Sequence, residues 1–433
     1  MFSIFAPVRF LYLLIESGYR LGIHVAAAWN PKARQWIRGR KEQKKNLADK
    51  LKQIQNAVIW MHCASLGEFE QGRPVFESLL DTFPNYQGVI TFFSPSGYIP
   101  AINYKRATHI FYLPFTNRMN KRRFVDALNP SLVLWVKYDY WQFYLSYLSS
   151  RKIPLLLISA TFQRSQAFFK WYGKQHKKIL QCFSHLFVQT EESKRLLKKI
   201  GIIEEVTVNG DTRFDRVLEI ASRHNNIPAV EEFCAGSQVI VAGSTWIDDE
   251  QELDHYANSN PQRSFIIAPH DTASYRISEV QRLFTRSIRF SEYEKQRAQP
   301  GFNAKAFRSK YNTLIIDNIG MLSRLYKYAS IAYVGGGFGN DGVHNVLEAA
   351  VYGKPVIFGP VFSKYMEAIE LLEEGGAFTV ETALELELKF NELFQNPELL
   401  RESGIQAEKY VFRKKGATEK IVRYVQEKRL LTS

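Results

Sequence analysis

Residues 335–348 read GGGFGNDGVHNVLE, a glycine-rich turn that runs into an expected helix beginning at Val343 and carrying Glu348 one turn later. A β-branched run at 331–334 precedes the turn and a second apolar run at 355–358 follows it. The stretch therefore predicts the strand, turn, helix and strand of a βαβ unit. Glycines let a backbone approach a ligand closely, and the N–H groups at a helix start attract an anion.

Asn345 and Glu348 are three residues apart, so we expect both side chains on one face of that helix. An amide and a carboxylate in this position can hold the hydroxyl groups of a sugar while the helix start faces a phosphate. A nucleotide-sugar site is therefore the inference that the stretch favours.

Two other interpretations of the same glycines stay open. Gly337, Gly339 and Gly342 satisfy the G-x-G-x-x-G pattern of dinucleotide sites, and they follow an expected strand. Such a site also requires an acidic residue at the end of the next strand, where this chain reads FGP at residues 358–360. The other interpretation is that the glycines serve only a tight turn.

The length of the chain and the alternation of its apolar runs predict two α/β domains. Its 433 residues exceed the usual size of one domain, and a hydrophobic content of 45% is ample for two cores. Short apolar runs alternate with longer helical patterns, as in folds built on parallel sheets. The expected strands are 57–62, 88–93, 132–136, 155–158, 186–188, 239–242, 265–268, 314–316, 331–334 and 355–358. We expect Rossmann-like domains at 46–217 and 218–433, the second with a terminal helix, and a surface insertion at 286–312.

The cysteines are few, widely spaced and odd in number: Cys63, Cys182 and Cys234. This pattern argues against a disulfide framework or a zinc site and fits a reducing, cytosolic setting. No Asp-x-Asp metal motif occurs, so neither a metal nor another cofactor is expected.

The first 45 residues combine positive charge with an apolar helix. The net charge of the chain is +14, and residues 1–50 contain ten Lys and Arg against three Asp and Glu. Ile4, Val8, Leu11 and Ile15 recur at helical spacing, but the apolar stretch is shorter than the ~20 residues that a membrane span requires. Aromatic and basic residues follow it: Trp29, Lys32, Arg34, Trp36, Arg38, Arg40, Lys41, Lys44 and Lys45.

This pattern is typical of a monotopic anchor on an anionic leaflet, so residues 1–45 are predicted to be a membrane-associating segment. The alternative is an ordinary helix that packs on the domain and leaves a solvated basic face. Nucleic acid is not an expected partner, because the basic run lacks any recognised nucleic-acid module. A secretory signal is not expected either, because no basic region precedes the apolar stretch.

Glu68 is the candidate catalytic group of the first half. It lies in the segment Ala64–Gln71, directly after the first expected strand, and ligands of doubly wound folds bind beyond the carboxyl ends of the strands. A carboxylate there can accept a proton from an attacking hydroxyl, whereas Glu70 should point elsewhere. The alternative is a helix-start carboxylate that only complements the helix dipole.

Several ordered motifs match one family. They are Ser65-Leu66-Gly67-Glu68, Pro130 with Trp135 and Trp141, Gly210-Asp211-Thr212-Arg213-Phe214-Asp215, Gly243-Ser244-Thr245 with Asp249-Glu250, Gly335-Gly336 through His344-Asn345 to Leu347-Glu348, and Gly359-Pro360; Ile153-Pro154 and Ser159-Ala160 match only partly. Through most of its length the chain resembles the Kdo transferases, which transfer 3-deoxy-D-manno-oct-2-ulosonic acid (Kdo) from CMP-Kdo to the lipid A precursor in Gram-negative bacteria. The first motif, G-S-T and the G-H-N-x-L-E signature are specific in this order, whereas any one alone is not.

Three segments depart from the pattern of the family. Where the family has an acidic E-x-E-x-W, this chain reads KYDYW at 137–141 and so loses one carboxylate at Lys137. The family's A-P-R-H is APHD at 268–271, with no arginine after the proline. The family's G-E-L is GML at 320–322.

The resemblance implies a GT-B glycosyltransferase, an α/β protein in which two Rossmann-like domains face an interdomain cleft. The acceptor would bind the domain at 46–217 and CMP-Kdo the domain at 218–433. Glu68 would deprotonate an acceptor hydroxyl, which would attack the anomeric carbon of Kdo in one inverting step. The acceptor contacts implied are Ser65 and Gly67, and the donor contacts are Arg213, Ser244, Thr245, Pro269, His270, Gly320, Leu322, Gly336, His344, Asn345 and Glu348. The enzyme would be peripheral on the cytoplasmic face of the inner membrane, where the lipid A precursor resides.

Three alternatives stay open. A different GT-B enzyme that uses a UDP- or GDP-sugar would keep the fold and the pair of Asn345 and Glu348. A sugar-nucleotide epimerase has the double Rossmann shape but does not need an N-terminal anchor. A non-catalytic membrane-associated protein would show no turnover.

Overall fold

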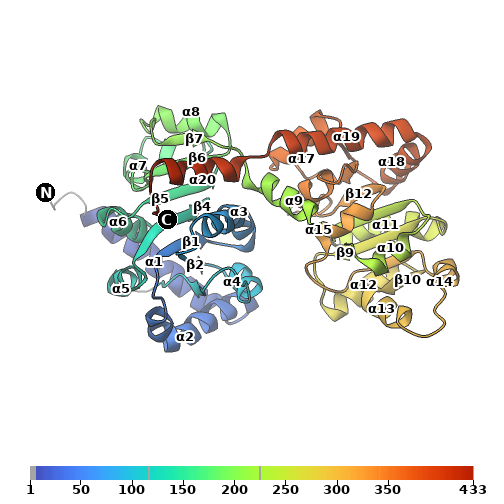
Figure 1. The fold of residues 1–433 in the computed structure, drawn as a ribbon, viewed down its shortest axis with the longest axis horizontal. Helices are drawn as coiled ribbons and strands as arrows, with labels where there is room; N and C mark the ends of the chain where they lie inside the picture. Colours follow the sequence, from blue (N-terminus) through green and yellow to red (C-terminus); the bar gives the residue numbers. More distant parts are fainter. Residues whose placement is uncertain (1–5, 116–117, 224–225, 341, 433) are drawn as a thin grey trace. The chain divides into compact units, whose positions relative to one another are not determined.

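The protein folds into two compact α/β units, shown in Figure 1. The structure is a computed structural model that describes residues 6–115, 118–223, 226–340 and 342–432. The first unit comprises residues 1–216 and 416–433, and the second comprises residues 217–415. Each unit contains one seven-stranded sheet in which every strand pairing is parallel, so the predicted fold class is confirmed.

The sheet of the first unit has the strand order β3-β2-β1-β4-β5-β6-β7. Its strands are β1 (Val58–Cys63), β2 (Gln87–Phe92), β3 (His109–Tyr112), β4 (Pro130–Val136), β5 (Leu155–Ala160), β6 (His185–Val188) and β7 (Val206–Val208). The central strands are unbroken apolar runs because helices cover both faces of the sheet. The order reverses between β1 and β4, which is where ligands bind in such sheets.

The helices of the first unit connect these strands. They are α3 (Leu66–Thr82), α4 (Pro95–Ala101), α5 (Arg118–Leu128), α6 (Gln142–Ser150), the 3₁₀ turn η1 (Ala167–Phe169), α7 (Lys174–Leu180), α8 (Glu191–Lys199) and α9 (Thr212–Ser222), the last of which crosses into the second unit.

The N-terminal segment packs on the first unit, which corrects the prediction of a separate segment at 1–45. It forms α1 (Ala6–Ala26) and α2 (Pro31–Lys52). Glu16 of α1 and Lys121 of α5 form a buried ion pair of 2.8 Å. Trp36 of α2 is buried among Phe93 and Phe115, with ring centroids 6.0 Å away in each case. The segment is therefore part of the domain from at least Glu16 onward.

Some apolar side chains of the predicted membrane-associating segment nevertheless remain on the surface. Leu21 and Val25, one helical turn apart on α1, are 67% and 54% exposed, and Trp29 is 69% exposed. Ile4 lies outside the described residues, as do the side chains of Val8, Leu11 and Ile15. No helix in the described part of the chain is long and apolar enough to cross a membrane.

The sheet of the second unit has the order β10-β11-β9-β8-β12-β13-β14 and reverses between β8 and β12. Its strands are β8 (Val239–Thr245), β9 (Ser264–Pro269), β10 (Ser287–Arg289), β11 (Thr313–Ile315), β12 (Ile331–Val334), β13 (Val356–Phe358) and β14 (Ala377–Thr379). Its helices are α10 (Pro228–Cys234), α11 (Ile247–Ser259), α12 (Ser274–Leu283), α13 (Phe290–Arg297), α14 (Ala304–Lys310), α15 (Leu322–Leu325), η2 (Tyr326–Tyr328), α16 (Leu347–Ala350), α17 (Met366–Glu373), α18 (Ala383–Gln395) and α19 (Pro397–Arg413).

All ten predicted strands are present, but residues 286–312 are not the surface insertion that was predicted. They form the edge strand β10 followed by α13 and α14. Ile288, Phe290 and Tyr293 of this segment are buried, so it contributes to the fold of the unit. Its high content of Arg, Lys, Gln and Ser reflects the exposed faces of two short helices.

The terminal helix α20 (Ala417–Glu427) belongs to the first unit, which corrects its predicted place in the second domain. Figure 1 shows it, in red, beside the elements of the first unit. Ile421, Val422 and Val425 join the core that contains the face of α3. Asp215 anchors the start of α20, because its carboxylate accepts hydrogen bonds of 2.6 Å from the backbone N–H groups of Gly416 and Thr418.

We expect Asp215→Ala to lower the stability of the first unit by about 2 kcal/mol, because a charged acceptor of two helix-start N–H groups is lost. Urea denaturation followed by circular dichroism measures the change. Glu419→Ala, which removes only an exposed ion pair with Arg423 on the same helix, serves as the control and should cost about 0.5 kcal/mol or less. Equal stabilities of the two variants would contradict the anchoring role of Asp215.

Candidate functional site

Glu68 lies in the first turn of α3, directly beyond the carboxyl end of β1. Its side chain is buried, and its Oε2 accepts a hydrogen bond from the backbone N–H of Ala64. Burial raises the pKa of Glu68 to about 7; the bond from Ala64 and the charge of Lys137 act against the rise, and the charge of Asp139 adds to it. A carboxyl with such a pKa can exchange a proton near neutral pH, as a general base must.

The loop after β4 supplies the charged neighbours of Glu68. Lys137 adopts a left-handed backbone with φ of 56°, at the point where the chain leaves β4. Asp139 accepts a hydrogen bond of 3.1 Å from the indole N–H of Trp141, and its Oδ2 lies 3.5 Å from Nε2 of the buried His62. Because β1 and β4 flank the reversal of strand order, these groups share one edge of the sheet.

His62 was not among the predicted site residues, and Asp139 was noted only as part of the 137–141 motif. Nδ1 of His62 lies 2.9 Å from the hydroxyl of Thr91, which also accepts a bond from the indole of Trp60. The ring of His62 is 4.2 Å from that of Trp135, centroid to centroid. These contacts join the adjacent strands β2, β1 and β4. In the sequence, only the acidic residue in the 137–141 motif could have indicated that His62 has a charged neighbour.

The other predicted residues of this loop lie where a substrate can reach them. Ser65 is the N-cap residue of α3 and is half-buried, and Gly67 is exposed with open space beside its Cα. Glu70 faces away from Glu68, as predicted, and contacts Arg73 and Arg216 at 3.5 and 3.3 Å.

Arg213 belongs to the first unit, whereas the other predicted donor contacts belong to the second. Its guanidinium forms an ion pair of 2.7 Å with the buried Asp211, which also accepts a bond from the backbone N–H of Arg213. Burial opposes ionisation of Asp211, but Arg213 outweighs it and keeps the pKa of this carboxyl below its usual value. Arg213 thus has an acidic partner already in place.

In the second unit, the end of β8 and the loop that follows β12 lie against each other. Ser244 and Gly336 both have a left-handed backbone, with φ of 55° and 91°. A Cβ on Gly335 would lie 2.5 Å from the carbonyl oxygen of Ser244, and one on Gly337 would lie 2.5 Å from the nitrogen of Gly359. The glycines are therefore required by the close approach of three backbone segments.

Two buried carboxylates on α11 hold these loops. Asp249 accepts hydrogen bonds from the backbone N–H groups of Gly336 and Trp246, at 2.8 and 2.9 Å, and from the hydroxyl of Tyr333 at 2.7 Å. Glu250 accepts a bond of 2.8 Å from the hydroxyl of Thr245 and contacts Arg276. Burial raises the pKa of both carboxyl groups.

Thr245 is consequently directed into the fold: it is fully buried, and its hydroxyl donates to Glu250. Ser244 is half-buried beside it. The G-S-T motif thus places one side chain near the surface and uses the next to hold the loop.

Three rings form a stack beside the two loops. The ring of His270, which follows β9, lies 4.6 Å from that of Trp246 and 4.7 Å from that of His344, and it is nearly parallel to both. The indole N–H of Trp246 donates a hydrogen bond of 3.0 Å to Nε2 of His344. An indole is only a donor, so His344 must accept at Nε2 and carry its proton on Nδ1. Trp246 was not among the predicted site residues.

Asn345 and Glu348 lie together, but not on one helical face as predicted. α16 begins at Leu347 rather than at Val343, because the backbone N–H groups of Val343 and His344 bond to the carbonyls of Val361 and Gly335. The amide of Asn345 donates a hydrogen bond of 3.0 Å to Glu348, and its oxygen accepts one from the N–H of Leu347. The pair is therefore already coupled.

The remaining predicted donor contacts lie around the same edge. Pro269 ends β9, next to His270. Leu322 begins α15 and packs against Gly243 at the end of β8. Gly320, with φ of 92°, is an exposed turn residue just before α15.

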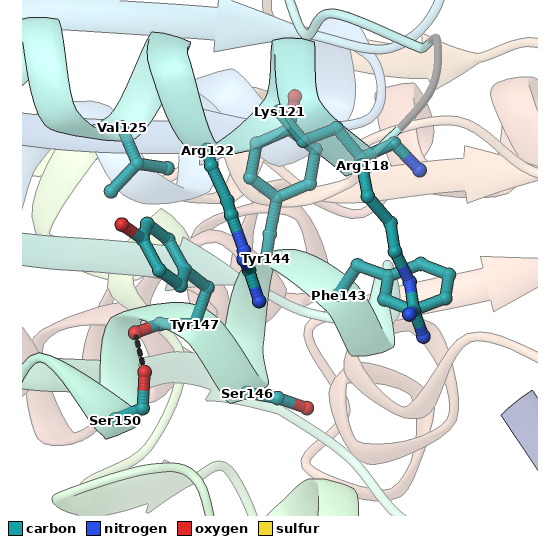
Figure 2. A pocket seen from close by; sticks show the side chains of 9 residues that line it. All are labelled: Arg118, Lys121, Arg122, Val125, Phe143, Tyr144, Ser146, Tyr147 and Ser150. Carbon is teal, nitrogen blue, oxygen red and sulfur yellow. Dashed lines mark hydrogen bonds between the residues drawn. The ribbon is translucent and has the colours of Figure 1, made fainter. Parts of the chain in front are cut away.

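The first unit also has a basic pocket of about 200 Å³ between α5 and α6. Figure 2 shows Arg118, Lys121 and Arg122 on α5 and the polar and aromatic side chains of α6 around it. The guanidinium of Arg118 lies 4.3 Å from the ring centroid of Phe143, and Lys121 is the partner of Glu16. The chemistry of the pocket suits an anionic group.

Comparisons with known proteins agree with this geometry. The family model described as "3-Deoxy-D-manno-octulosonic-acid transferase (kdotransferase)" matches residues 35–216. The 3-deoxy-D-manno-octulosonic acid transferase of Aquifex aeolicus is 29% identical over 349 residues, which are 78% of this chain and 86% of that protein. A protein of the same name from Chlamydia trachomatis serovar A is 26% identical over 357 residues, 78% of each chain.

Solved structures have the same fold. The UDP-GlcNAc 2-epimerase of Neisseria meningitidis has a TM-score of 0.53 and 16% identity, and the match covers 86% of this chain and all of that one. MurG of Acinetobacter baumannii has a TM-score of 0.53 and 13% identity, with 86% and 99% covered.

The two parallel sheets, each with a reversal of strand order, define the GT-B fold class. Within this class, the resemblance to the Kdo transferase family that the motifs predicted is confirmed by the family model and by the relatives named above.

We expect Gly335→Ala to destabilise the second unit by about 1–3 kcal/mol, because the new Cβ would overlap the backbone of Ser244 and Thr245. The midpoint of urea denaturation measures this. Gly339→Ala is the matched control in the same turn, since its Cβ would meet no described atom closer than 3.6 Å. A Gly335→Ala protein as stable as the control would show that the three backbone segments are not closely packed.

Proposed function

We propose that the protein transfers Kdo from CMP-Kdo to the lipid A precursor, lipid IVA, with inversion at the anomeric carbon and with Glu68 as general base. The observation that carries the proposal is the buried Glu68 with its pKa raised to about 7, beyond the strand that flanks the reversal of the first sheet. The family resemblance supplies the donor and the acceptor.

In this reaction the ionised Glu68 takes the proton of an acceptor hydroxyl. The oxygen forms a bond to the anomeric carbon of Kdo as the bond from that carbon to the phosphate of CMP breaks. The hydrogen bond from Ala64 and the charge of Lys137 stabilise the carboxylate before the step, and Asp139 disfavours it. Burial raises the pKa of Glu68, so its carboxylate is a stronger base than an exposed one and is still partly ionised at neutral pH.

The second unit would hold the donor at the loops beyond β8 and β12. Ser244 and the Nδ1–H of His344 offer hydrogen bonds to an anionic group, and the backbone at Gly336 allows close approach. Asn345 and Glu348 together would bind hydroxyl groups of the nucleotide. Arg213, if it contacts the donor, would do so while paired with Asp211.

An acidic lipid acceptor would account for two features of the first unit that have no part in the transfer step: its exposed apolar surface near the N-terminus and its basic pocket. Leu21, Val25 and Trp29 are exposed beside the basic residues Arg20 and Lys32. Such a surface binds the boundary of an anionic leaflet, so we place the enzyme as a peripheral protein on the cytoplasmic face of the inner membrane. The basic pocket in Figure 2 would then face the charge of the acceptor or of neighbouring lipids.

We expect Glu68→Gln to lower kcat by about 100-fold or more, the usual loss when a general base is removed. Mass spectrometry of the lipid A precursor after incubation with CMP-Kdo measures the product. Glu70→Gln is the control, because Glu70 is paired with Arg73 and Arg216, and it should lose little.

The pH profile gives an independent check of the same residue. A base acts only when ionised, so kcat/KM of the wild type should rise with pH through about 7 and level off above it. Near-wild-type turnover of Glu68→Gln, or a profile that stays flat from pH 5 to 8, would remove Glu68 from the mechanism.

We expect Asn345→Ala and Glu348→Ala each to weaken CMP binding by about 1–3 kcal/mol. Because the two side chains bond to each other, the double variant should lose less than the sum of the single losses. Calorimetric titration with CMP measures all three proteins, with UDP and GDP as competing nucleotides. Unchanged CMP affinity, or tighter binding of UDP or GDP, would contradict the proposed donor site.

A further inference from the structure

A large groove lies between α2 and α5 of the first unit, and the proposed transfer step does not use it. Its volume is about 620 Å³. The lining residues are Arg40, Gln43, Lys44, Leu47, Ala48 and Leu51 on one side and Pro114, Phe115, Arg123, Phe124 and Ala127 on the other, with Lys52 and Asn120 at its edges. The walls are therefore largely apolar, and every charged side chain among these residues is a cation.

The cations are placed at the ends and rim of the groove. Along α2, Arg40 and Lys52 are twelve residues apart, or roughly 18 Å of helix. Lys44 and Arg123 are exposed on opposite walls. No acidic residue lines the groove within the described part of the chain, so an anionic occupant is favoured over a cationic or neutral one.

Arg40 points to a ligand most directly. Its Nη2 donates a hydrogen bond of 2.8 Å to the carbonyl of Phe93, and its guanidinium lies 3.7 Å from the ring centroid of Trp36. Its Nε and Nη1 are buried and have no hydrogen-bond partner among the described residues. Buried donors are nearly always satisfied, so these two nitrogens are suited to an acceptor that the chain itself does not supply.

One packed cluster connects the wall of the groove to the loop that holds Glu68. Phe115, which lines the groove, packs with Trp36 and Phe93 in one cluster, and Ala64 lies against that cluster. The backbone N–H of Ala64 is the hydrogen-bond donor to Glu68. A ligand in the groove thus lies beside the carboxyl edge of the sheet where the acceptor sugar is proposed to bind.

We propose that the groove between α2 and α5 binds one acyl chain of the lipid acceptor, with an anionic group of the same lipid on its cationic ends. This inference rests on the proposed function and adds a subsite to it. An apolar trough as long as a long acyl chain, with cations and no acids, is complementary to an anionic amphiphile. A peptide helix would instead require partners for its own charged side chains.

The test fills the groove from each wall in the full-length protein with Ala48→Trp and Ala127→Trp. Both alanines are exposed, so the larger side chain is accommodated without disturbing the core. Binding of cis-parinaric acid, a fluorescent fatty acid, should weaken about tenfold or more, since two methylene groups left unburied account for that factor. KM for the acylated acceptor should rise by a similar factor, while kcat and KM for the fully deacylated acceptor stay unchanged.

Asn103→Trp is the matched control, because Asn103 is an exposed residue of the first unit that lines neither the groove nor the pocket in Figure 2. It should leave fatty-acid binding and KM for the acylated acceptor unchanged. If all three variants unfold at the same midpoint temperature as the wild type, a loss of overall stability is excluded as the cause.

The outcomes separate the groove from the proposed function. Wild-type fatty-acid binding by both groove variants overturns the proposal. The proposal is also overturned if the groove variants no longer sediment with anionic vesicles but keep an unchanged KM for the acylated acceptor. That result would assign the groove to a lipid of the bilayer. If the wild type transfers Kdo to neither acceptor, the proposed function fails, and weakened fatty-acid binding by the groove variants still supports an acyl site.

Discussion

The reversal of strand order in each parallel sheet is the constraint on which the rest of the structure depends. At such a reversal the connections leave in opposite directions, and ligands of such folds bind outside the carboxyl ends of the two neighbouring strands. In the first unit these strands are β1 and β4, and they deliver Glu68 and Lys137. In the second they are β8 and β12, and they deliver Ser244 and Gly336. Sites of different chemistry thus follow from one topological rule.

Buried carboxylates, and not only apolar packing, hold the loops of the second unit. Asp249 accepts hydrogen bonds from two backbone N–H groups and a hydroxyl, and Glu250 accepts them from a hydroxyl and a guanidinium. Removing such groups from water is costly, and only complete hydrogen bonding offsets the cost. The loops are consequently fixed before any ligand arrives, which is the condition for tight positioning of a small anionic group.

The sequence predicted the parts of the fold that depend on long apolar runs. The ten central strands are buried on both faces and could be read as such runs, whereas the missed strands β3, β7, β10 and β14 are edge or near-edge strands of three or four residues. Glu68 could be predicted because its position follows from the first strand alone. The stack of Trp246, His270 and His344 could not, because three separate loops create it.

The prediction of a helix from Val343 was wrong for a related reason. Local spacing favours a helix there, but tertiary hydrogen bonds to Val361 and Gly335 take the N–H groups of Val343 and His344 first. Arg40 shows the same limit: in the sequence it is one of many cations, and its contacts with Phe93 and Tyr112, which are distant in the sequence, direct it inward. Patterns report local preference, and long-range contacts can override it.

The anchoring of α20 by Asp215 also bears on the order in which the two units complete their folding. The chain leaves the first unit just after Asp215 and returns at Gly416, so the second unit is an insertion between two hydrogen-bonded points of the first. During synthesis, residues 217–415 emerge before Ile421 and Val425, which complete a core of the first unit. The second unit can therefore close its own core while α3 still lacks its partner helix, so the first unit is completed after the second, contrary to the usual order for consecutive domains.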